Sequence, residues 1–216
     1  MKLLLHICCG PCAIYPIKHL AGKKFDEIVG YYYNPNIHPP SEFKKRRDAL
    51  KEAEKRLDFN PPSRNSPADS DGNSDSARFS PRRSEEKDST PVRARSFKVI
   101  YPPYVMEEYF RKISSKEDSP ERCSLCWELR LLQTADYAKE NSFDGFTTTL
   151  LISPYQNHEI VKDISERIAK EKGIDFYYED FRKGFRESQD KAKELDVYRQ
   201  KYCGCVFSEL ERVKVK

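Results

Sequence analysis

Short apolar runs recur along the chain and alternate with longer, charged stretches in which apolar residues return at helical spacing. Each run spans only a few residues and is followed by a turn signal, so we predict buried strands at these places. The expected strands are residues 3–8, 27–33, 98–101, 146–152 and 175–178. The expected helices are residues 12–20, 41–57, 105–113, 120–141 and 157–172, with a mostly helical end from about residue 186.

This alternation predicts an α/β fold. Strands that alternate with helices form a parallel, doubly wound sheet with helices on both faces, here followed by a helical C-terminal part. In such sheets the functional site lies beyond the carboxyl ends of the strands. Because Cys8 and Cys9 end the first expected strand, we expect the site at this edge.

Residues 60–96 break the pattern. The segment is rich in Ser, Pro, Arg and Asp, and Phe79 is its one aromatic residue. Such a composition buries too little apolar surface to offset the entropy lost on ordering, so we expect a disordered, low-complexity insertion. Its arginines and serines could serve RNA binding or phosphorylation, but an inert loop is favoured. Without it the second helix would connect directly to the third strand, so we predict a single α/β catalytic domain over residues 1–216.

The overall composition narrows the function only slightly. The 216 residues are 38 % hydrophobic and 34 % charged with a net charge of +4, which permits a polyanionic partner without requiring one. No apolar run approaches the roughly 18 residues that a membrane span needs. The apolar start is too short for a signal peptide. We therefore expect a cytoplasmic protein that does not bind membranes.

The seven cysteines form three clusters: Cys8, Cys9 and Cys12; Cys123 and Cys126; Cys203 and Cys205. An odd number cannot pair completely as disulfides, and in a reducing compartment thiols serve metals or redox chemistry. Cysteines that merely fill a core would be scattered among the apolar runs. The clustering therefore favours a metal or redox site.

Four of these thiols could bind one metal centre. Cys123 and Cys126 are three residues apart on an expected helix and share a face. Cys8 and Cys9 would diverge on a regular strand but can converge if the chain bends at Gly10. Four thiolates suit a [4Fe–4S] cluster or a structural zinc, and adjacent cysteines are unusual for zinc, so the cluster is favoured. Cys12 is then either a ligand of a second metal or a packed side chain.

The pair Cys203 and Cys205 is separated by one glycine. A disulfide across so short a spacing is strained and therefore labile, as a catalytic pair requires. The alternative is that both are further metal ligands. Among the histidines, we expect His6 to be packed in the core, His38 to lie in a loop that could face the site, and His158 to cap a helix.

Four motifs in this order resemble the QueH-type epoxyqueuosine reductases: HICCGPC at 6–12, YNPNIH at 33–38, RCSLC at 122–126 and YRQKYCGC at 198–205. The resemblance covers nearly the whole chain outside 60–96. It implies a sheet of the adenine-nucleotide α-hydrolase-like type. Where related ATP pyrophosphatases carry a phosphate-binding loop, this chain has cysteines and Pro11, which lacks an amide donor. We therefore expect a metal site in place of a nucleotide site.

The resemblance also implies an activity. It is the two-electron deoxygenation of epoxyqueuosine, at the wobble base of certain tRNA anticodons, to queuosine, without a corrinoid. A [4Fe–4S] cluster on Cys8, Cys9, Cys123 and Cys126 would supply electrons, which come from an electron donor, and an additional iron could act as a Lewis acid. The resemblance suggests Cys203 and Cys205 as a redox-active pair. Asp180 is the candidate carboxylate near a metal, with a solvent-facing turn residue as its alternative.

A basic stretch near the C-terminus is the candidate tRNA-binding surface, because Lys and Arg contact phosphates and aromatic residues stack on unpaired bases. The candidate basic residues are Arg182, Arg186, Arg199 and Lys201, and the aromatic residues between them are Phe181, Phe185, Tyr198 and Tyr202. The alternative is that the aromatic residues belong to the core and the charges only face solvent. Two other functions remain open: a zinc-stabilised RNA-binding module and a metal-free thiol oxidoreductase.

Overall fold

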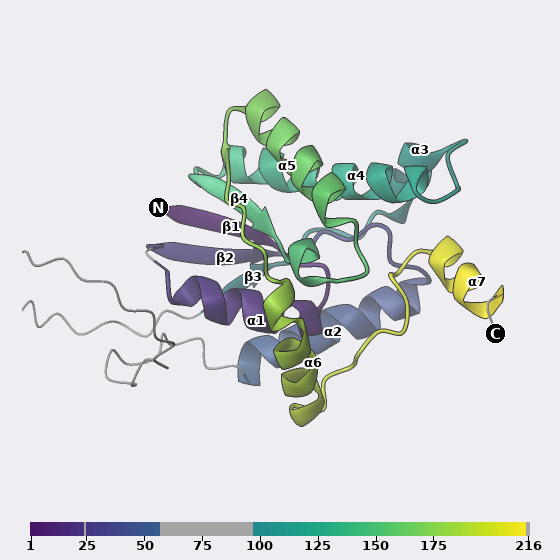
Figure 1. Cartoon of the computed structure of the whole chain (residues 1–216), viewed down its shortest axis with the longest axis horizontal. Coiled ribbons are helices and arrows are strands. Elements are labelled where there is room, and N and C mark those ends of the chain that lie inside the picture. Colours follow the sequence, from purple (N-terminus) through teal and green to yellow (C-terminus); the bar gives the residue numbers. More distant parts are fainter. Residues whose placement is uncertain (24, 57–96, 215–216) are drawn as a thin grey trace, which may run out of the picture.

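The computed structural model describes residues 1–23, 25–56 and 97–214 (Figure 1). Its sheet has five strands in the order β3-β2-β1-β4-β5, and every pair is parallel. The strands are β1 Lys2–His6, β2 Glu27–Tyr31, β3 Lys98–Ile100, β4 Gly145–Thr148 and β5 Asp175–Phe176. The predicted parallel α/β sheet is therefore confirmed.

Helices cover both faces of the sheet, as predicted (Figure 1). One face carries α1 (Gly10–Ala21), α2 (Pro40–Arg56) and α6 (Phe185–Glu194). The other carries α4 (Glu121–Glu140) and α5 (His158–Lys172), and α3 (Met106–Ile113) packs against α4. The short helix α7 (Val206–Lys214) ends the described chain. No helix of the described residues is both long enough and apolar enough to cross a membrane.

The centre of the sheet forms the core. Leu3, Leu4 and Leu5 of β1 and Phe146 of β4 are all completely buried. A strand between two helical layers must be apolar on both sides, which explains why β1 is a continuous apolar run rather than an alternating one.

The predicted strand over 146–152 is correct only in its first part. The strand β4 ends at Thr148, and a 3₁₀ helix, η1, spans Thr149–Ile152. The Thr148 hydroxyl accepts a hydrogen bond from the Leu150 amide at 3.1 Å, which turns the chain out of the sheet. Residues 149–152 stay buried in either conformation, so the apolar run alone could not reveal the change.

The predicted helical C-terminal part is present as two helices, α6 and α7, with an irregular segment between them. Residues 195–205 connect α6 to α7 without regular structure and carry Cys203 and Cys205. The insertion predicted at 60–96 lies outside the described residues.

The strand order creates a switch point at the carboxyl end of β1. From β1 the chain proceeds to β2 and β3 on one side, whereas β4 and β5 lie on the other. Loops after β1 and β4 therefore leave the sheet in opposite directions, which opens the space where doubly wound proteins bind ligands. The first cysteines follow β1 directly and η1 follows β4, so both border this space.

Candidate metal and redox site

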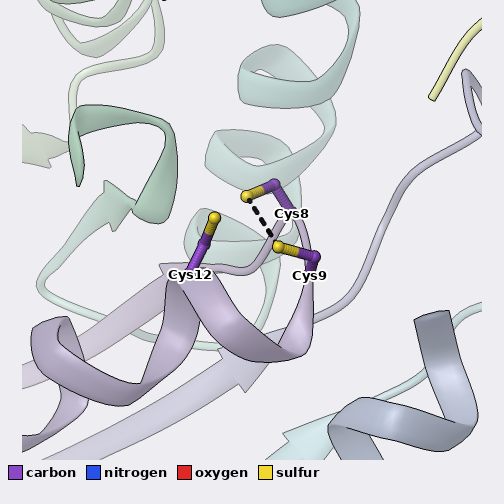
Figure 2. A group of neighbouring side chains, drawn as sticks. All are labelled: Cys8, Cys9 and Cys12. Atoms are coloured by element: carbon purple, nitrogen blue, oxygen red, sulfur yellow. Dashed lines mark hydrogen bonds between the residues drawn. The ribbon is translucent and has the colours of Figure 1, made fainter. Parts of the chain in front are cut away.

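Three sulfur atoms lie together at the switch point. The Sγ atoms of Cys8, Cys9 and Cys12 are all within 4.8 Å of one another (Figure 2). Cys9 is the N-cap residue of α1 in an extended conformation, and Cys12 lies in the first helical turn. The strand ends at His6, so the adjacent cysteines are not in a regular strand and need not point to opposite faces. This triad can hold a metal ion.

Thr149, which follows β4 on the other side of the switch point, forms hydrogen bonds with Cys8. The Cys8 amide donates to Thr149 Oγ1 at 3.0 Å, and the Thr149 hydroxyl donates to Cys8 Sγ at 3.2 Å. Hydrogen bonds from Cys12 and Cys9 place the pKa of the Cys8 thiol well below its usual value, with smaller contributions from Arg130 and Thr149. Burial raises the pKa of Cys9 instead. The triad therefore favours one thiolate, which is the metal-binding form.

Arg130 lies between this triad and the second cluster of thiols. Its Nη1 is 3.9 Å from Cys126 Sγ, and its Nη2 donates to Asn34 Oδ1 at 2.8 Å. Burial by itself lowers the pKa of Arg130, but the negative potentials of Cys126, Cys8 and Cys203 raise it above its usual value. Arg130 is thus the shared electrostatic neighbour of one cysteine from each cluster.

Arg130 is also unusual in its partners. It is only 2 % exposed, and within the described residues its guanidinium contacts an amide oxygen and a sulfur but no carboxylate. A buried charge is costly unless an opposite charge compensates it. Of the thiols that act on Arg130, Cys8 is the one whose pKa lies below its usual value, whereas those of Cys126 and Cys203 are raised, so Cys8 is the thiolate that can do so.

The third cluster reaches the site from residues 195–205. The Gln200 side-chain amide donates to Cys9 Sγ at 2.9 Å, and the Gln156 amide lies 3.8 Å from Cys203 Sγ. Cys205 is buried in one apolar cluster with Cys126. Cys203 is exposed, and all seven thiols are free. The three clusters, which are far apart in sequence, therefore converge on one region.

Arg46 holds the backbone around Cys203. Its Nη1 donates to the Cys203 carbonyl at 2.8 Å and its Nη2 to the Tyr202 carbonyl at 3.1 Å, while Nε pairs with Glu42 at 2.8 Å. Gly204 has a φ of +140°, and a Cβ there would lie 3.1 Å from Arg46 Nη1. The residue between the two cysteines must therefore be glycine. Arg46 and Gly204 together support the observed conformation of the Cys-Gly-Cys backbone.

Several buried polar atoms around the thiols have no hydrogen-bond partner among the described residues. They include Tyr32 Oη and Arg130 Nε. Burial raises the pKa of Tyr32, and the nearby Cys9 and Cys8 raise it further. An unsatisfied buried donor is costly. Clustered thiols, a buried cation and unpaired donors together fit an anionic metal–sulfur group.

Asp180, the carboxylate predicted near a metal, is paired with an arginine. It accepts hydrogen bonds from the Arg182 amide at 3.0 Å and from the Arg182 guanidinium at 2.6 Å. These bonds lower the pKa of Asp180 to about 2. Its hydrogen bonds within the described residues go to Arg182 and not to a cysteine. A catalytic role for Asp180 stays a prediction.

The predicted RNA-binding residues lie at the surface. The side chains of Arg182, Arg186, Arg199 and Lys201 are all exposed. The aromatic residues between them differ: Phe181 is completely buried, whereas Tyr198 is 37 % exposed. Phe181 therefore belongs to the core, as the alternative interpretation predicted for the aromatic residues.

Two histidines have structural partners. His6 is completely buried, and its Nδ1 and Nε2 lie 2.8 Å from Thr148 Oγ1 and 3.2 Å from the Tyr33 carbonyl. Burial lowers the pKa of His6 to about 3, so the ring is neutral and packed, as predicted. His158 bonds to the Tyr178 hydroxyl, and Asn157, not His158, caps α5.

His38 is buried, and both of its ring nitrogens are without hydrogen-bond partners in the described part of the chain. Its amide donates to the Gly204 carbonyl at 2.8 Å. The loop that contains His38 therefore lies against the Cys-Gly-Cys segment, in agreement with its expected position beside the site.

The site includes residues that the motifs did not single out, above all Thr149, Arg130 and Arg46. Arg130 could have been found, because it lies four residues after Cys126 and thus on the same helical face. Arg46 and Thr149 carry no such signal. Their roles depend on contacts with residues 157 and 141 positions away in the chain.

A doubly wound parallel sheet that gathers thiols at its switch point defines a class of protein: an α/β protein with a cysteine-rich site suited to metal or redox chemistry. The family model described as epoxyqueuosine reductase QueH matches residues 3–69 and 74–211. The chain therefore belongs to the QueH family. The match includes most of 60–96, which the motif comparison had left out of the resemblance.

Individual relatives agree with the family match. The epoxyqueuosine reductase QueH of Dehalococcoides mccartyi is 36 % identical over 98 % of this chain and 94 % of its own length. That of Thermotoga maritima is 31 % identical over 97 % of this chain and 91 % of its own length. That of Streptococcus pyogenes is 30 % identical over 96 % of this chain and 70 % of its own length.

Proposed function

We propose that this protein is an epoxyqueuosine reductase, an oxidoreductase of tRNA modification that removes the epoxide oxygen of epoxyqueuosine and leaves the alkene of queuosine. The observation that carries the proposal is the convergence of three cysteine clusters around the buried Arg130. Membership of the QueH family supports the substrate.

The proposed cofactor is a [4Fe–4S] cluster on Cys8, Cys9, Cys123 and Cys126, with Cys12 available to an additional iron. When bound, these groups supply single electrons and a Lewis acid for the epoxide oxygen. The mutual distances of Cys8, Cys9 and Cys12 support a metal at this triad. Cys126 is buried and its pKa is raised to about 12, chiefly by burial, so its ionised form requires a strong positive partner such as a metal.

The proposed electron source for one turnover is the thiol pair Cys203 and Cys205. Reduction of the epoxide to an alkene consumes two electrons and two protons and releases the oxygen as water. Oxidation of two thiols to one disulfide supplies two electrons and two protons, so the equation balances. An external electron donor then reduces the disulfide. Both thiols are free and Cys203 is exposed, which would allow a donor to reach it.

Other residues have supporting roles in this proposal. Arg130 would balance the negative charge of the thiolates, and Arg46 would keep the thiol pair beside them. Asp180 remains the proposed carboxylate near the reaction. Arg182, Arg186, Arg199 and Lys201 would contact tRNA phosphates, since they are exposed cations.

Two measurements test the proposal. Protein purified without oxygen should contain iron and sulfide, be brown, and convert epoxyqueuosine in tRNA to queuosine, as followed by mass spectrometry of the nucleosides. The Cys123→Ser variant should lose iron and colour. Ser124→Ala is the matched control, because Ser124 lies between the two cysteines of α4 and, within the described residues, its hydroxyl bonds to the backbone carbonyl of Pro120.

Other results would refute the proposal in distinct ways. A colourless protein with about one zinc, in which Cys203 and Cys205 are dispensable, would be a zinc-stabilised RNA-binding module. Activity that survives complete chelation, together with a titratable disulfide, would indicate a metal-free thiol oxidoreductase. A fully loaded protein that leaves the epoxide intact would refute the substrate.

A further inference from the structure

Tyr155 is the most conspicuous exposed aromatic side chain at the edge of the site. It is 84 % exposed, more than any other large hydrophobic residue of the described chain. A single exposed aromatic residue is ordinary on a protein surface, so the surroundings of Tyr155 decide whether it marks a binding site.

The turn that carries Tyr155 is held in place on both sides. The Tyr155 amide donates to Ser153 Oγ at 3.3 Å, and the next residue, Gln156, accepts a hydrogen bond from Trp127 Nε1 at 2.8 Å. The other end of the Gln156 amide reaches Cys203 Sγ at 3.8 Å. Tyr155 is thus one residue away from a direct contact with the thiol pair, on a turn that needs no ordering when a partner binds.

The surroundings of Tyr155 match a nucleic acid. Phe185 forms an edge-to-face contact with the Tyr155 ring at 5.9 Å between centroids, which leaves a face of Tyr155 open. Lys183 and Arg186 flank Phe185 and are both exposed. Aromatic faces next to cations are the means by which proteins bind unpaired bases of RNA loops.

We propose that Tyr155, supported by Phe185, is a stacking platform for a nucleotide next to the modified base in the anticodon loop. This inference rests on the proposed function, which requires the wobble base to enter the thiol site. Tyr155 is adjacent to Gln156, whose side chain lies 3.8 Å from Cys203 Sγ, so the platform borders the site that the wobble base would enter. Lys183 and Arg186 contact the phosphates on either side.

The test uses the metal-loaded full chain and an anticodon stem-loop RNA that carries epoxyqueuosine. Tyr155→Ala should raise both Kd and KM roughly ten-fold through the loss of one stacked base, with a much smaller change in kcat. Tyr155→Phe, which keeps the ring, should stay close to the wild type. Lys170→Ala, an exposed cation at the far end of α5, is the matched surface control and should change neither constant.

Two further measurements separate stacking from charge. The loss in Tyr155→Ala should persist at high salt, whereas the loss in Lys183→Ala should shrink, because phosphate contacts are screened. RNA with an abasic nucleotide at the stacked position should bind the wild type more weakly than intact RNA does. Tyr155→Ala, which has already lost the stacking contact, should bind both RNAs equally.

The possible results test the stacking role of Tyr155 and the proposed reductase function separately. If the wild type reduces the RNA and Tyr155→Ala does so with unchanged KM, the platform is refuted while the function stands. If the wild type binds RNA through Tyr155 but reduces nothing, the function is refuted and the platform stands. If the loaded wild type does not bind the RNA, both are refuted.

Discussion

The site has a buried floor and an exposed rim, and the two differ in how their polar groups are satisfied. We use floor for Cys8, Cys9, Cys12, Cys126 and Arg130. We use rim for Tyr155, Gln156 and Cys203, together with Asp180 and Arg182 in the roles proposed for them above. Floor residues contact thiols and amides and leave buried donors without partners. Rim residues face solvent, and Asp180 and Arg182 satisfy each other.

This difference has a physical meaning. In a low-dielectric interior an unpaired charge or donor is costly and persists only when function requires it, whereas at the surface water compensates the same group. The floor therefore carries the stronger indication of a bound group. The rim carries indications of access and of partner binding. Changes in the floor should affect metal content, and changes in the rim should affect turnover or binding alone.

The largest expected effect follows from Cys8→Ser. Cys8 is the sulfur that the triad and Thr149 favour as a thiolate, and serine is a poor ligand for soft metals. We expect the variant to lose its metal and all reductase activity. Iron analysis of anaerobic protein checks this, with circular dichroism to show that the fold is kept. Full iron content in a folded Cys8→Ser variant would remove Cys8 from the ligand set.

Cys203→Ser should separate turnover from metal content. Cys203 is exposed and lies on the irregular segment, not on the floor. We expect the variant to keep its iron but to lose turnover, including the first, because Cys205 alone cannot supply two electrons by forming a disulfide. Iron analysis and a time course of queuosine formation on the same sample provide the readout. Loss of iron together with activity would make Cys203 primarily a ligand and contradict the proposed roles.

The contrast between floor and rim also explains how far the sequence could predict the site. The apolar runs predicted the parallel sheet, and the end of β1 predicted the first cysteines at its carboxyl edge, because strand burial and strand direction are properties of local pattern. The convergence of Cys8, Cys126 and Cys203 near Arg130 is a long-range result of packing. The clustering of the cysteines predicted that Cys8 and Cys126 share a metal centre, and the family motifs added Cys203 beside it, but neither indicated Arg130.

Other features were invisible in the sequence for a different reason. The change from strand to 3₁₀ helix at Thr148 depends on one side-chain hydrogen bond within an apolar run. The exposure of Tyr155 and the burial of Phe181 are decided by tertiary packing, since both are aromatic residues in polar surroundings. Composition treats such residues alike, whereas the fold places one in the core and the other at the rim.

Arg130→Gln should change the reduction potential of the metal centre while its cysteine ligands stay in place. Loss of a buried positive charge next to the thiols disfavours the added electron, so the reduction potential of the metal centre should fall. A unit charge about 6 Å away at an effective dielectric constant of about 20 corresponds to a shift on the order of 100 mV. Potentiometric titration measures it, and Arg130→Lys, which keeps the charge, should shift the potential less. An unchanged potential at full iron content would show that Arg130 does not act on the metal centre.

Asp180→Asn should have the smallest effect, which concerns stability and its pH dependence. The pKa of Asp180 is lowered from 3.8 to about 2 by Arg182, so the ionised carboxylate stabilises the fold. This contribution to stability is fully present above pH 3.8, the ordinary pKa of the carboxyl, and is lost as the pH falls through about 2. Because both side chains are more than a third exposed to solvent, we expect Tm to fall by roughly 1 °C near neutral pH. The difference should disappear towards pH 2 in thermal melts. Turnover of the same variant provides the second readout: a loss far beyond this small change in stability would assign the carboxylate to the chemistry and bring one rim residue into the reaction itself.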